Sequence, residues 1–407
     1  MIKTYFNLSE FIIKHVTKRK QSLLALDFEK YKNELNRRIN GKKVLVIGGA
    51  GTIGSFYIKA ILKFTIAKLV VVDINENGLT ELVRDLRSST GYNIPDDFIT
   101  YPVNFGEPVF EKIFRHHGPF EIVANFAAHK HVRSEKDIFS IEAMIENNVL
   151  RARKLLELLL QNPPEHFFCV STDKAANPVN VMGASKKLME ELIMAYSNKI
   201  PIKTARFANV AFSNGSLPLG FLERLNKNQP LSCPFGIRRF FVSPEESGEL
   251  CLMASILGES GDIFFPKLDE EKDMIQFDKI ALALLDELGL KPDICTTEEE
   301  ARIKATNSTV NSKKWPIFFF NSDTSGEKNF EEFYTENEIL DNKSFIHLGV
   351  IKNSIKRDTT ELDEIFMNLR QLFQNPKVEK SEVVEILKKY LPNFGHIETG
   401  KHLDQKM

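Results

Sequence analysis

Val44-Leu45-Val46-Ile47-Gly48-Gly49-Ala50-Gly51-Thr52-Ile53-Gly54 is the stretch that decides the fold of this 407-residue chain. Four apolar residues typical of a buried strand run directly into a glycine turn, and a helical pattern follows over residues 55–64. A second apolar run, residues 68–72, ends at Asp73, about twenty residues beyond the turn. This order of strand, glycine turn, helix, strand and acid predicts a Rossmann βαβ unit.

The glycine turn has the chemistry of a dinucleotide site. Glycines let the backbone turn tightly and approach a pyrophosphate, and the N-terminus of the following helix points its positive dipole at the same group. The expected contacts are Gly48, Gly51, Thr52, Ile53 and Gly54. Asp73 can accept hydrogen bonds from a free ribose 2′-hydroxyl but repels a 2′-phosphate, and residues 74–77 contain no arginine to bind that phosphate. The sequence therefore favours NAD over NADP.

Strand and helix patterns keep alternating beyond Asp73. Apolar runs typical of strands cover residues 98–103, 121–128, 166–170 and 203–207, with long helical stretches at 141–161 and 184–198. This alternation predicts an α/β fold with a Rossmann doubly wound parallel sheet covered by helices on both faces. Ligands bind beyond the carboxyl ends of such strands, where Ala127, Ala128 and residues 171–174 fall.

Four segments are expected along the chain. Residues 1–40 form an N-terminal helical extension that packs on the body or on a subunit partner; the alternative is adhesion to a membrane surface through Lys18-Arg19-Lys20. Residues 41–208 form the NAD-binding domain. Residues 209–345 form mainly a smaller α/β substrate-binding domain, some of whose strands could return to the first sheet. Residues 346–407 are expected to be a helical tail, and the polar residues 296–312 to lie at the surface.

Composition excludes several classes of function. The chain is 43% hydrophobic and 27% charged, and 54 Lys+Arg against 55 Asp+Glu leave a net charge of -1, which does not favour nucleic acid as a partner. Its 4 cysteines are far apart and form no CxxC pair, so neither a disulfide framework nor a metal site is predicted. No apolar run is long enough for a membrane span, and no signal peptide is recognisable. We expect a cytoplasmic homo-oligomer that binds a small substrate.

Six short strings carry a resemblance to a known family. They are Gly48 to Gly54, Ala127-Ala128 with Lys130-His131-Val132, Ser171 to Lys186, Arg206 to Val210, Arg239-Phe240-Phe241 and Gly326-Glu327-Lys328. In this order they resemble the extended short-chain dehydrogenase/reductases of polysaccharide biosynthesis, the CapD-like type. Within these the chain looks most like the UDP-N-acetylglucosamine 4,6-dehydratases. The resemblance covers roughly residues 41–335.

The resemblance implies a reaction in which NAD stays bound. A UDP-sugar, UDP-N-acetylglucosamine above all, is oxidised at C4, loses water across C5 and C6, and receives the same hydride at C6. The product is a 4-keto-6-deoxy sugar nucleotide used in bacterial glycan biosynthesis. The resemblance also assigns roles to four residues: Thr172 contacts the C4 oxygen, Asp173 is the acid for the C6 hydroxyl, Lys174 is the base for the C5 proton, and Lys186 holds the nicotinamide ribose.

The role of Lys174 carries a condition. A lysine must be neutral to act as a base, so we expect burial or neighbouring positive charge, such as that of Lys186, to lower the pKa of Lys174.

Met182 stands where many relatives carry a catalytic tyrosine. A thioether has no ionisable proton, so another group must take the proton of the C4 hydroxyl. Asp173, Thr172 through a water molecule, and the cofactor ribose are the candidates. In the family, methionine at this position accompanies retention of configuration at C5 and tyrosine accompanies inversion.

Substrate contacts are also implied by the resemblance. They are Lys130, His131, Asn209, Ser213, Gly215, Ser216 and Arg239, the last as a charged donor to the diphosphate. Two positions depart from the family pattern: Asn104 stands where an acid often contacts adenine, and Thr324-Ser325 replaces an Arg-Pro pair. Two alternatives stay open, a nucleotide-sugar 4-epimerase or dehydrogenase, and a scaffold that binds NAD without turnover.

Overall fold

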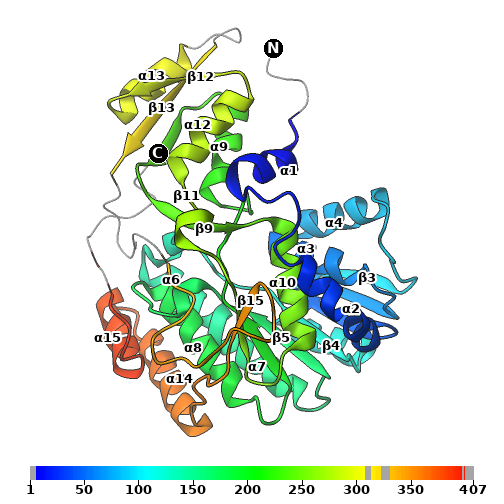
Figure 1. Cartoon of the computed structure of the whole chain (residues 1–407). Helices are drawn as coiled ribbons and strands as arrows, with labels where there is room; N and C mark the ends of the chain where they lie inside the picture. Colours follow the sequence, from blue (N-terminus) through cyan, green and yellow to red (C-terminus); the bar gives the residue numbers. More distant parts are fainter. Residues whose placement is uncertain (1–5, 308–312, 322–330, 397, 399–407) are drawn as a thin grey trace.

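A nine-stranded sheet forms the centre of the molecule in the computed structural model, which describes residues 6–307, 313–321, 331–396 and 398 (Figure 1). The strands lie in the order β14-β15-β10-β6-β5-β4-β1-β2-β3. Seven of them run parallel: β1 (Lys43–Ile47), β2 (Lys68–Asp73), β3 (Phe98–Pro102), β4 (Ile122–Asn125), β5 (His166–Val170), β6 (Ile202–Ala205) and β10 (Ile263–Pro266). The predicted doubly wound Rossmann fold is confirmed.

Helices flank this sheet in two groups. One group contains α2 (Ala25–Ile39), α3 (Thr52–Ile61) and α10 (Pro244–Leu257), which pack on one another. The other contains α6 (Ile138–Ile145), α7 (Arg151–Leu159) and α8 (Val181–Ala195). The π-helical segment η3 (Glu146–Leu150) joins α6 to α7, so the helix predicted over 141–161 is one continuous helical run. Helices α4 (Glu76–Ser88) and α5 (Pro108–His117) follow β2 and β3.

Strand register brings the predicted functional residues to one edge of the sheet. Ile47, the last residue of β1, is paired with Asn125 of β4, and Asn125 is paired with Cys169 of β5. The glycine turn, the segment after β4 and the segment after β5 therefore begin side by side. This edge is the one at which parallel α/β sheets bind ligands.

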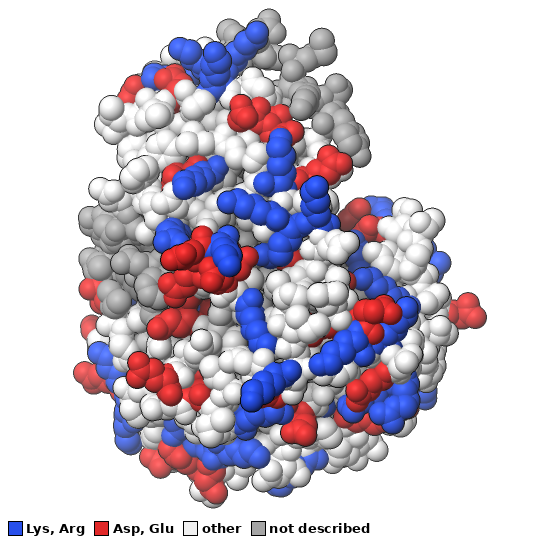
Figure 2. All heavy atoms as spheres, in the orientation of Figure 1, with Lys and Arg blue, Asp and Glu red and all other residues white. Residues whose placement is uncertain are grey.

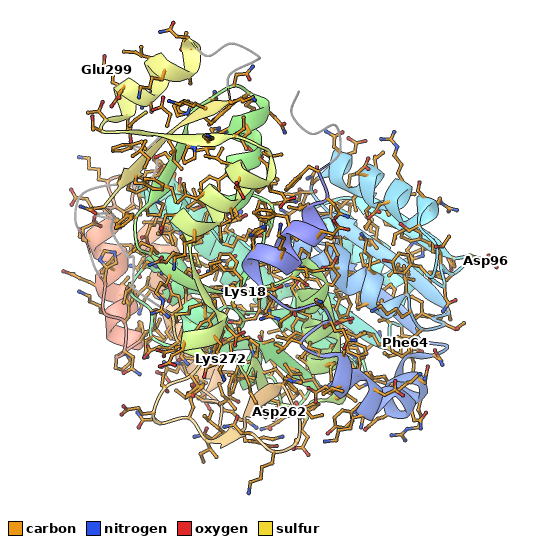
Figure 3. The ribbon with its side chains drawn as sticks, turned by 45° about the horizontal axis from the view of Figure 1, so that its top comes forward. Lys18, Phe64, Asp96, Asp262, Lys272 and Glu299 are labelled. Carbon is orange, nitrogen blue, oxygen red and sulfur yellow. The ribbon has the colours of Figure 1, made fainter. Side chains whose placement is uncertain are left out.

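A smaller second domain contains two three-stranded sheets. One holds β7 (Asn209–Val210), β9 (Arg238–Val242) and β11 (Met274–Gln276), and the other holds β8 (Leu231–Pro234), β12 (Lys291–Cys295) and β13 (Lys314–Phe320). Its helices are α9 (Leu217–Asn226), α11 (Glu270–Asp273), α12 (Phe277–Glu287) and α13 (Glu298–Thr306). Helix α13 occupies much of the stretch predicted only as polar surface, and its Glu299 lies at the far end of the molecule from Asp96 (Figure 3).

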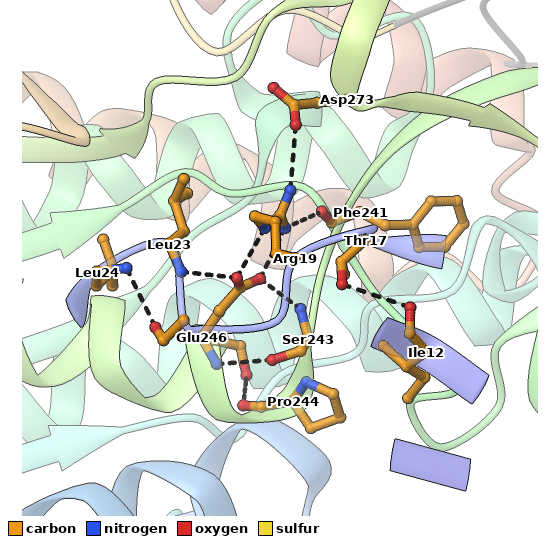
Figure 4. Close-up of polar contacts among 12 residues, drawn as sticks. Ile12, Thr17, Arg19, Leu23, Leu24, Phe241, Ser243, Pro244, Glu246 and Asp273 are labelled. Carbon is orange, nitrogen blue, oxygen red and sulfur yellow. Dashed lines mark hydrogen bonds and ion pairs between the residues drawn. The ribbon is translucent and has the colours of Figure 1, made fainter. Parts of the chain in front are cut away.

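The N-terminal extension bridges the two domains. Its first part, α1 (Leu8–Phe11) and η1 (Ile12–Val16), packs into the core of the second domain, whereas α2 packs into the main core. Between them, Arg19 pairs with Glu246 of α10 at 2.8 Å and with Asp273 at 3.2 Å, and donates to the Phe241 carbonyl (Figure 4). The structure supports packing on the body, because the central arginine of the basic run is engaged in these contacts.

The C-terminal segment is not only helical, in contrast to the expectation for residues 346–407. Strand β15 (Leu348–Ile351) lies antiparallel beside β10, and β14 (Leu340–Asp341) pairs with β15 at the edge of the main sheet. The run of four residues in β15 is too short to separate from a helix by periodicity. Helices α14 (Thr359–Phe373) and α15 (Lys380–Tyr390) pack together, with α14 against α8 (Figure 1).

Basic and acidic side chains are interspersed over the face shown in Figure 2. Within the residues that the structure describes, no helix combines the length and the apolar character needed to cross a membrane. The same residues contain no cluster of three or more His, Cys, Asp or Glu side chains suited to a metal ion.

Candidate active site

The glycine turn has the geometry that the motif predicts. Gly48 has a φ of 77°, in the left-handed region, and a Cβ at this position would lie 2.5 Å from the Ala127 amide nitrogen. A Cβ at Gly54 would overlap the Gly48 carbonyl oxygen. Both positions therefore require glycine, which lets the turn pack tightly between β1 and the segment after β4.

A cavity of about 300 Å³ opens at this turn. Its walls include six of the predicted cofactor residues: Gly48, Gly51, Asp73, Asn104, Ala127 and Ala128. Thr52, Ile53 and Gly54 form the first turn of α3 just beyond the cavity. Ile74, His129 and Arg151 also line it and were not predicted; Arg151 lies 3.6 Å from Glu146.

Asp73 is fixed in the orientation that a ribose contact needs. One carboxylate oxygen accepts the Ala50 amide of the glycine turn at 2.9 Å, and the other accepts the Asn75 amide at 2.9 Å. The carboxylate thus faces the cavity as part of the turn itself. These residues fit NAD, because a carboxylate at this point accepts ribose hydroxyls and a glycine turn at a helix N-terminus accepts a pyrophosphate.

Asp173 and Lys174 form an acid and base pair directly after β5, in which Asp173 is buried and the Lys174 side chain is 19% exposed. Asp173 is 3% exposed. Its Oδ1 accepts three hydrogen bonds, from the Thr172 hydroxyl at 2.8 Å, the Lys174 amide at 2.9 Å and the Lys174 Nζ at 3.1 Å. The other oxygen, Oδ2, accepts no hydrogen bond from a residue that the structure describes, so it is the oxygen available to carry a proton. The Thr172 hydroxyl hydrogen is directed at Asp173.

The pKa of Lys174 differs from the sequence expectation. Burial lowers the pKa of Lys174, but the Asp173 and Glu331 carboxylates raise it by a larger amount. The pKa therefore stands above the ordinary lysine value. The expectation of a lowered pKa is therefore wrong. The sequence could not indicate this, because Glu331 approaches Lys174 to 3.7 Å from a distant part of the chain. It directly follows a stretch outside the described residues that includes Gly326-Glu327-Lys328 and Thr324-Ser325.

Met182 and Lys186 occupy the first turns of α8 and are both buried. Asn180 caps this helix by accepting the Gly183 amide at 2.7 Å. Lys186 donates from Nζ to the Val170 carbonyl at the end of β5, at 2.8 Å, and burial lowers its pKa. The Lys186 cation is thereby held at the same strand end as Asp173 and Lys174.

Asn148 is a buried residue that the sequence reasoning missed. Its amide group accepts from the His129 amide nitrogen at 2.8 Å and donates to the His129 carbonyl at 2.9 Å. It also donates to the Ser185 hydroxyl at 3.1 Å, and that hydroxyl donates to the Met182 carbonyl. Asn148 therefore ties the segment after β4 to helix α8. The polar pair Asn147-Asn148 inside an apolar helix was the available signal.

A buried hydrogen-bond network that the sequence did not predict supports the end of β5. Arg206, which is fully buried, pairs through two nitrogens with Glu190 of α8 at 2.8 and 2.9 Å. The Ser171 hydroxyl donates to the same glutamate at 2.6 Å. Arg206 also binds Glu338 at 2.9 Å and the Phe333 carbonyl at 3.1 Å. The network joins β5, β6 and α8 to the segment that carries Glu331.

The predicted substrate residues are only partly brought together. Gly215 (φ 72°) lies against the His131 ring, at which a Cβ would come within 2.7 Å. In the same loop, the Asn214 amide donates to the Thr52 hydroxyl at 3.0 Å, which brings the loop to the start of α3. Ser216 instead caps α9 by accepting the Leu219 amide.

The other predicted substrate residues occupy different surroundings. Asn209 and Arg239 lie on the paired strands β7 and β9, Ser213 is buried, and Lys130 is exposed. Arg239 is 6% exposed, and its positive charge acts on Lys174 by lowering the pKa of that lysine. Arg239 is therefore a predicted substrate residue whose charge acts directly on Lys174.

Glu135 provides a further buried carboxylate at the start of helix α8. It is 3% exposed and accepts the Val181 amide at the start of α8 at 2.6 Å. Burial raises its pKa to about 7, Lys380 and the α8 amides lower it, and Glu398 raises it.

Replacing Glu135 with glutamine should make stability less dependent on pH. A carboxyl whose folded pKa is raised stabilises the fold below its unfolded pKa, and this contribution is lost as pH rises through about 7. Relative to the parent, Glu135→Gln should gain up to roughly 3 kcal/mol between pH 5 and pH 8. Urea unfolding at both pH values measures the difference, with exposed Glu299→Gln as the control. An equal change in both variants would contradict the prediction.

Comparison with known proteins agrees with this geometry. Residues 44–352 match the family model described as polysaccharide biosynthesis protein. An uncharacterised membrane protein of Methanocaldococcus jannaschii is 32% identical over 73% of this chain and 82% of its own length. The capsular polysaccharide biosynthesis protein CapD of Staphylococcus aureus is 27% identical over 85% of this chain, which spans about half of CapD (54%).

Two enzyme classes occur among more distant relatives. A UDP-N-acetylglucosamine 4,6-dehydratase (inverting) of Campylobacter jejuni is 27% identical over 57% of this chain and 69% of its own length. A UDP-glucose 4-epimerase of Rickettsia canadensis is 31% identical over 62% of this chain and 73% of its own length.

Solved structures share the fold. Pen from Bacillus thuringiensis superposes with a TM-score of 0.63 over 82% of this chain and 98% of Pen, at 19% identity. The family model spans both the glycine turn and the acid and base pair, and ends one residue after β15. The chain therefore belongs to the polysaccharide biosynthesis protein family, as an extended short-chain dehydrogenase/reductase.

Proposed function

We propose that the protein is an NAD-dependent nucleotide-sugar 4,6-dehydratase. Its substrate is UDP-N-acetylglucosamine, and its product is a UDP-4-keto-6-deoxy sugar with the C5 configuration retained. The observation that carries this proposal is the pair formed by the buried Asp173 and the partly exposed Lys174, joined at 3.1 Å at the end of β5. Elimination of water needs a base for the C5 proton and an acid for the C6 hydroxyl, whereas simple epimerisation at C4 uses neither of these two groups.

The cofactor is held by the glycine turn and Asp73, with Asn104, Ala127 and Ala128 along the cavity. NAD, when bound, supplies the acceptor for the C4 hydride. Lys186 holds a positive charge at the strand end, where it stabilises the oxygen at C4 as negative charge develops on it. Met182 contributes no proton transfer, so the C4 proton leaves through Asp173 Oδ2, Thr172 with a water molecule, or the cofactor ribose.

Transfer of one proton from Lys174 to Asp173 produces the general acid and the general base together. Oδ1 of Asp173 accepts three hydrogen bonds, one of them from Lys174 Nζ, and the raised pKa of Lys174 favours its ammonium. Passing one proton across the 3.1 Å hydrogen bond leaves a carboxylic acid at Asp173 and an amine at Lys174. These are the two forms that elimination requires.

The protons then balance over the reaction. The Lys174 amine takes the C5 proton, and the Asp173 acid protonates the departing C6 hydroxyl, so water leaves and the pair returns to ammonium and carboxylate. The ammonium gives a proton back to C5 from the face that it left, which retains the configuration. The proton released from the C4 hydroxyl restores the ammonium. The relative from Campylobacter jejuni is an inverting dehydratase, so the retained outcome rests on Met182 and on this single base.

Incubation with UDP-N-acetylglucosamine tests the proposal. Mass spectrometry should find loss of one water, while absorbance shows no build-up of NADH. A product of unchanged mass would instead indicate a 4-epimerase, the second candidate, which the relative from Rickettsia canadensis favours. Unchanged substrate across several nucleotide sugars would contradict both enzymes and favour an NAD-binding scaffold.

A further inference from the structure

Glu331 brings a second carboxylate to the base. It is 7% exposed, and its Oε1 lies 3.7 Å from Lys174 Nζ, while Asp173 Oδ1 lies 3.1 Å from the same nitrogen. Asp173 is the sequence neighbour of Lys174, whereas Glu331 belongs to the segment after β13. The ammonium is therefore bracketed by two buried acids that come from separate parts of the chain.

The position of Glu331 is fixed by its neighbours. Arg206 holds this segment by donating hydrogen bonds to the Phe333 carbonyl at 3.1 Å and to the Glu338 carboxylate at 2.9 Å. The Phe333 ring packs on the Phe240 ring of β9, with 5.4 Å between the two ring centroids. Phe240 directly follows Arg239 in the sequence. The segment is thus tied to the sheet on one side and to the second domain on the other, so the carboxylate is held beside Lys174 by the fold.

We propose that Glu331 is a positioning residue for the dehydration: its carboxylate holds the Lys174 ammonium against Asp173 and determines when that lysine becomes a base. The inference rests on the proposed function, in which Lys174 removes and returns the C5 proton. An ammonium held by two carboxylates cannot rotate away after it has taken the proton. It therefore returns the proton to the face of C5 from which it came.

Burial and three neighbouring charged groups determine the charge of Lys174. Burial disfavours the ammonium, Asp173 and Glu331 favour it, and Arg239 disfavours it. Removing the Glu331 charge leaves one carboxylate to offset burial and Arg239, so the amine form becomes easier to reach. Removing the Arg239 charge has the opposite effect. The two substitutions therefore act in opposite directions, which general damage to the site cannot reproduce.

Acylation of Lys174 at a series of pH values measures this charge directly. The full-length protein with NAD is labelled briefly with acetic anhydride without substrate, and the Lys174 peptide is quantified by mass spectrometry. In Glu331→Gln the labelling midpoint should move down by about 1 pH unit or more. Arg239→Met should move it up. Glu332→Gln is the matched control, because its side chain is exposed and bonds to Asn177 instead.

Activity provides a second, independent readout. The acid limb of the dehydration rate should move to lower pH in Glu331→Gln, and Glu331→Asp should restore part of the parent profile. An unchanged labelling midpoint in a folded Glu331→Gln protein would overturn the proposal even if dehydration is observed. If the labelling midpoint shifts in Glu331→Gln but the parent protein dehydrates no nucleotide sugar, the dehydratase proposal is refuted, and the positioning role with it.

Discussion

Replacement of Lys174 with methionine is expected to lower the dehydration kcat by roughly 10²–10⁴-fold, the usual contribution of a positioned acid or base. Methionine fills a similar volume but cannot take the C5 proton. The cavity for NAD lies at the glycine turn and does not include Lys174, so the affinity for NAD should not change. Mass spectrometry of the sugar nucleotide gives the rate, and titration calorimetry with NAD gives the affinity.

The same variant separates oxidation from elimination. Oxidation at C4 does not require the C5 base, so the variant should accumulate enzyme-bound reduced cofactor, seen as absorbance near 340 nm, roughly one equivalent per active site. The exposed Lys199→Met serves as control and should keep the parent rate. Turnover within tenfold of the parent would remove Lys174 as the base and leave Asp173 to do both tasks.

Local sequence predicted the parts of the site that are local in the chain. The glycine turn and Asp73 lie within one βαβ unit, and Asp173 and Lys174 are adjacent, so spacing alone placed them at the sheet edge. The charge of Lys174 was mispredicted because Glu331, its second partner, comes from a segment far along the chain. Burial lowers the pKa of Lys174, but the Asp173 and Glu331 carboxylates raise it by more.

The supporting contacts could not be predicted for a related reason. Arg19 joins α10 and α11 across the domain boundary, and nothing in the basic run Lys18-Arg19-Lys20 distinguishes an ion-paired arginine from a solvated one. Strand β15 enters the main sheet from the end of the chain, where its pairing with β10 is antiparallel and set by tertiary contacts. The prediction of a homo-oligomer stays a prediction, which light scattering would test.

Arg206→Ala should destabilise the fold by roughly 3–5 kcal/mol, the usual cost of removing one partner from a buried ion pair. The side chain is fully buried, and its loss leaves Glu190 and Glu338 without their shared cation. Burial raises the pKa of Glu190, but Arg206 lowers it by more, so without the arginine the pKa of this carboxyl should rise. Urea unfolding at pH 7 measures the loss.

Comparison with an exposed arginine makes the cause identifiable. Arg302→Ala removes an ion pair with Glu298 one turn apart on α13, and pairs of this kind contribute about 0.3–0.5 kcal/mol. If both variants lose similar stability, the buried network is not the source of the loss. The free energy lost by Arg206→Ala should also fall at lower pH, because protonation of Glu190 relieves its unpaired charge. A loss independent of pH would mean that Arg206 acts through packing, and the segment carrying Glu331 would then be held by Phe333 rather than by charge.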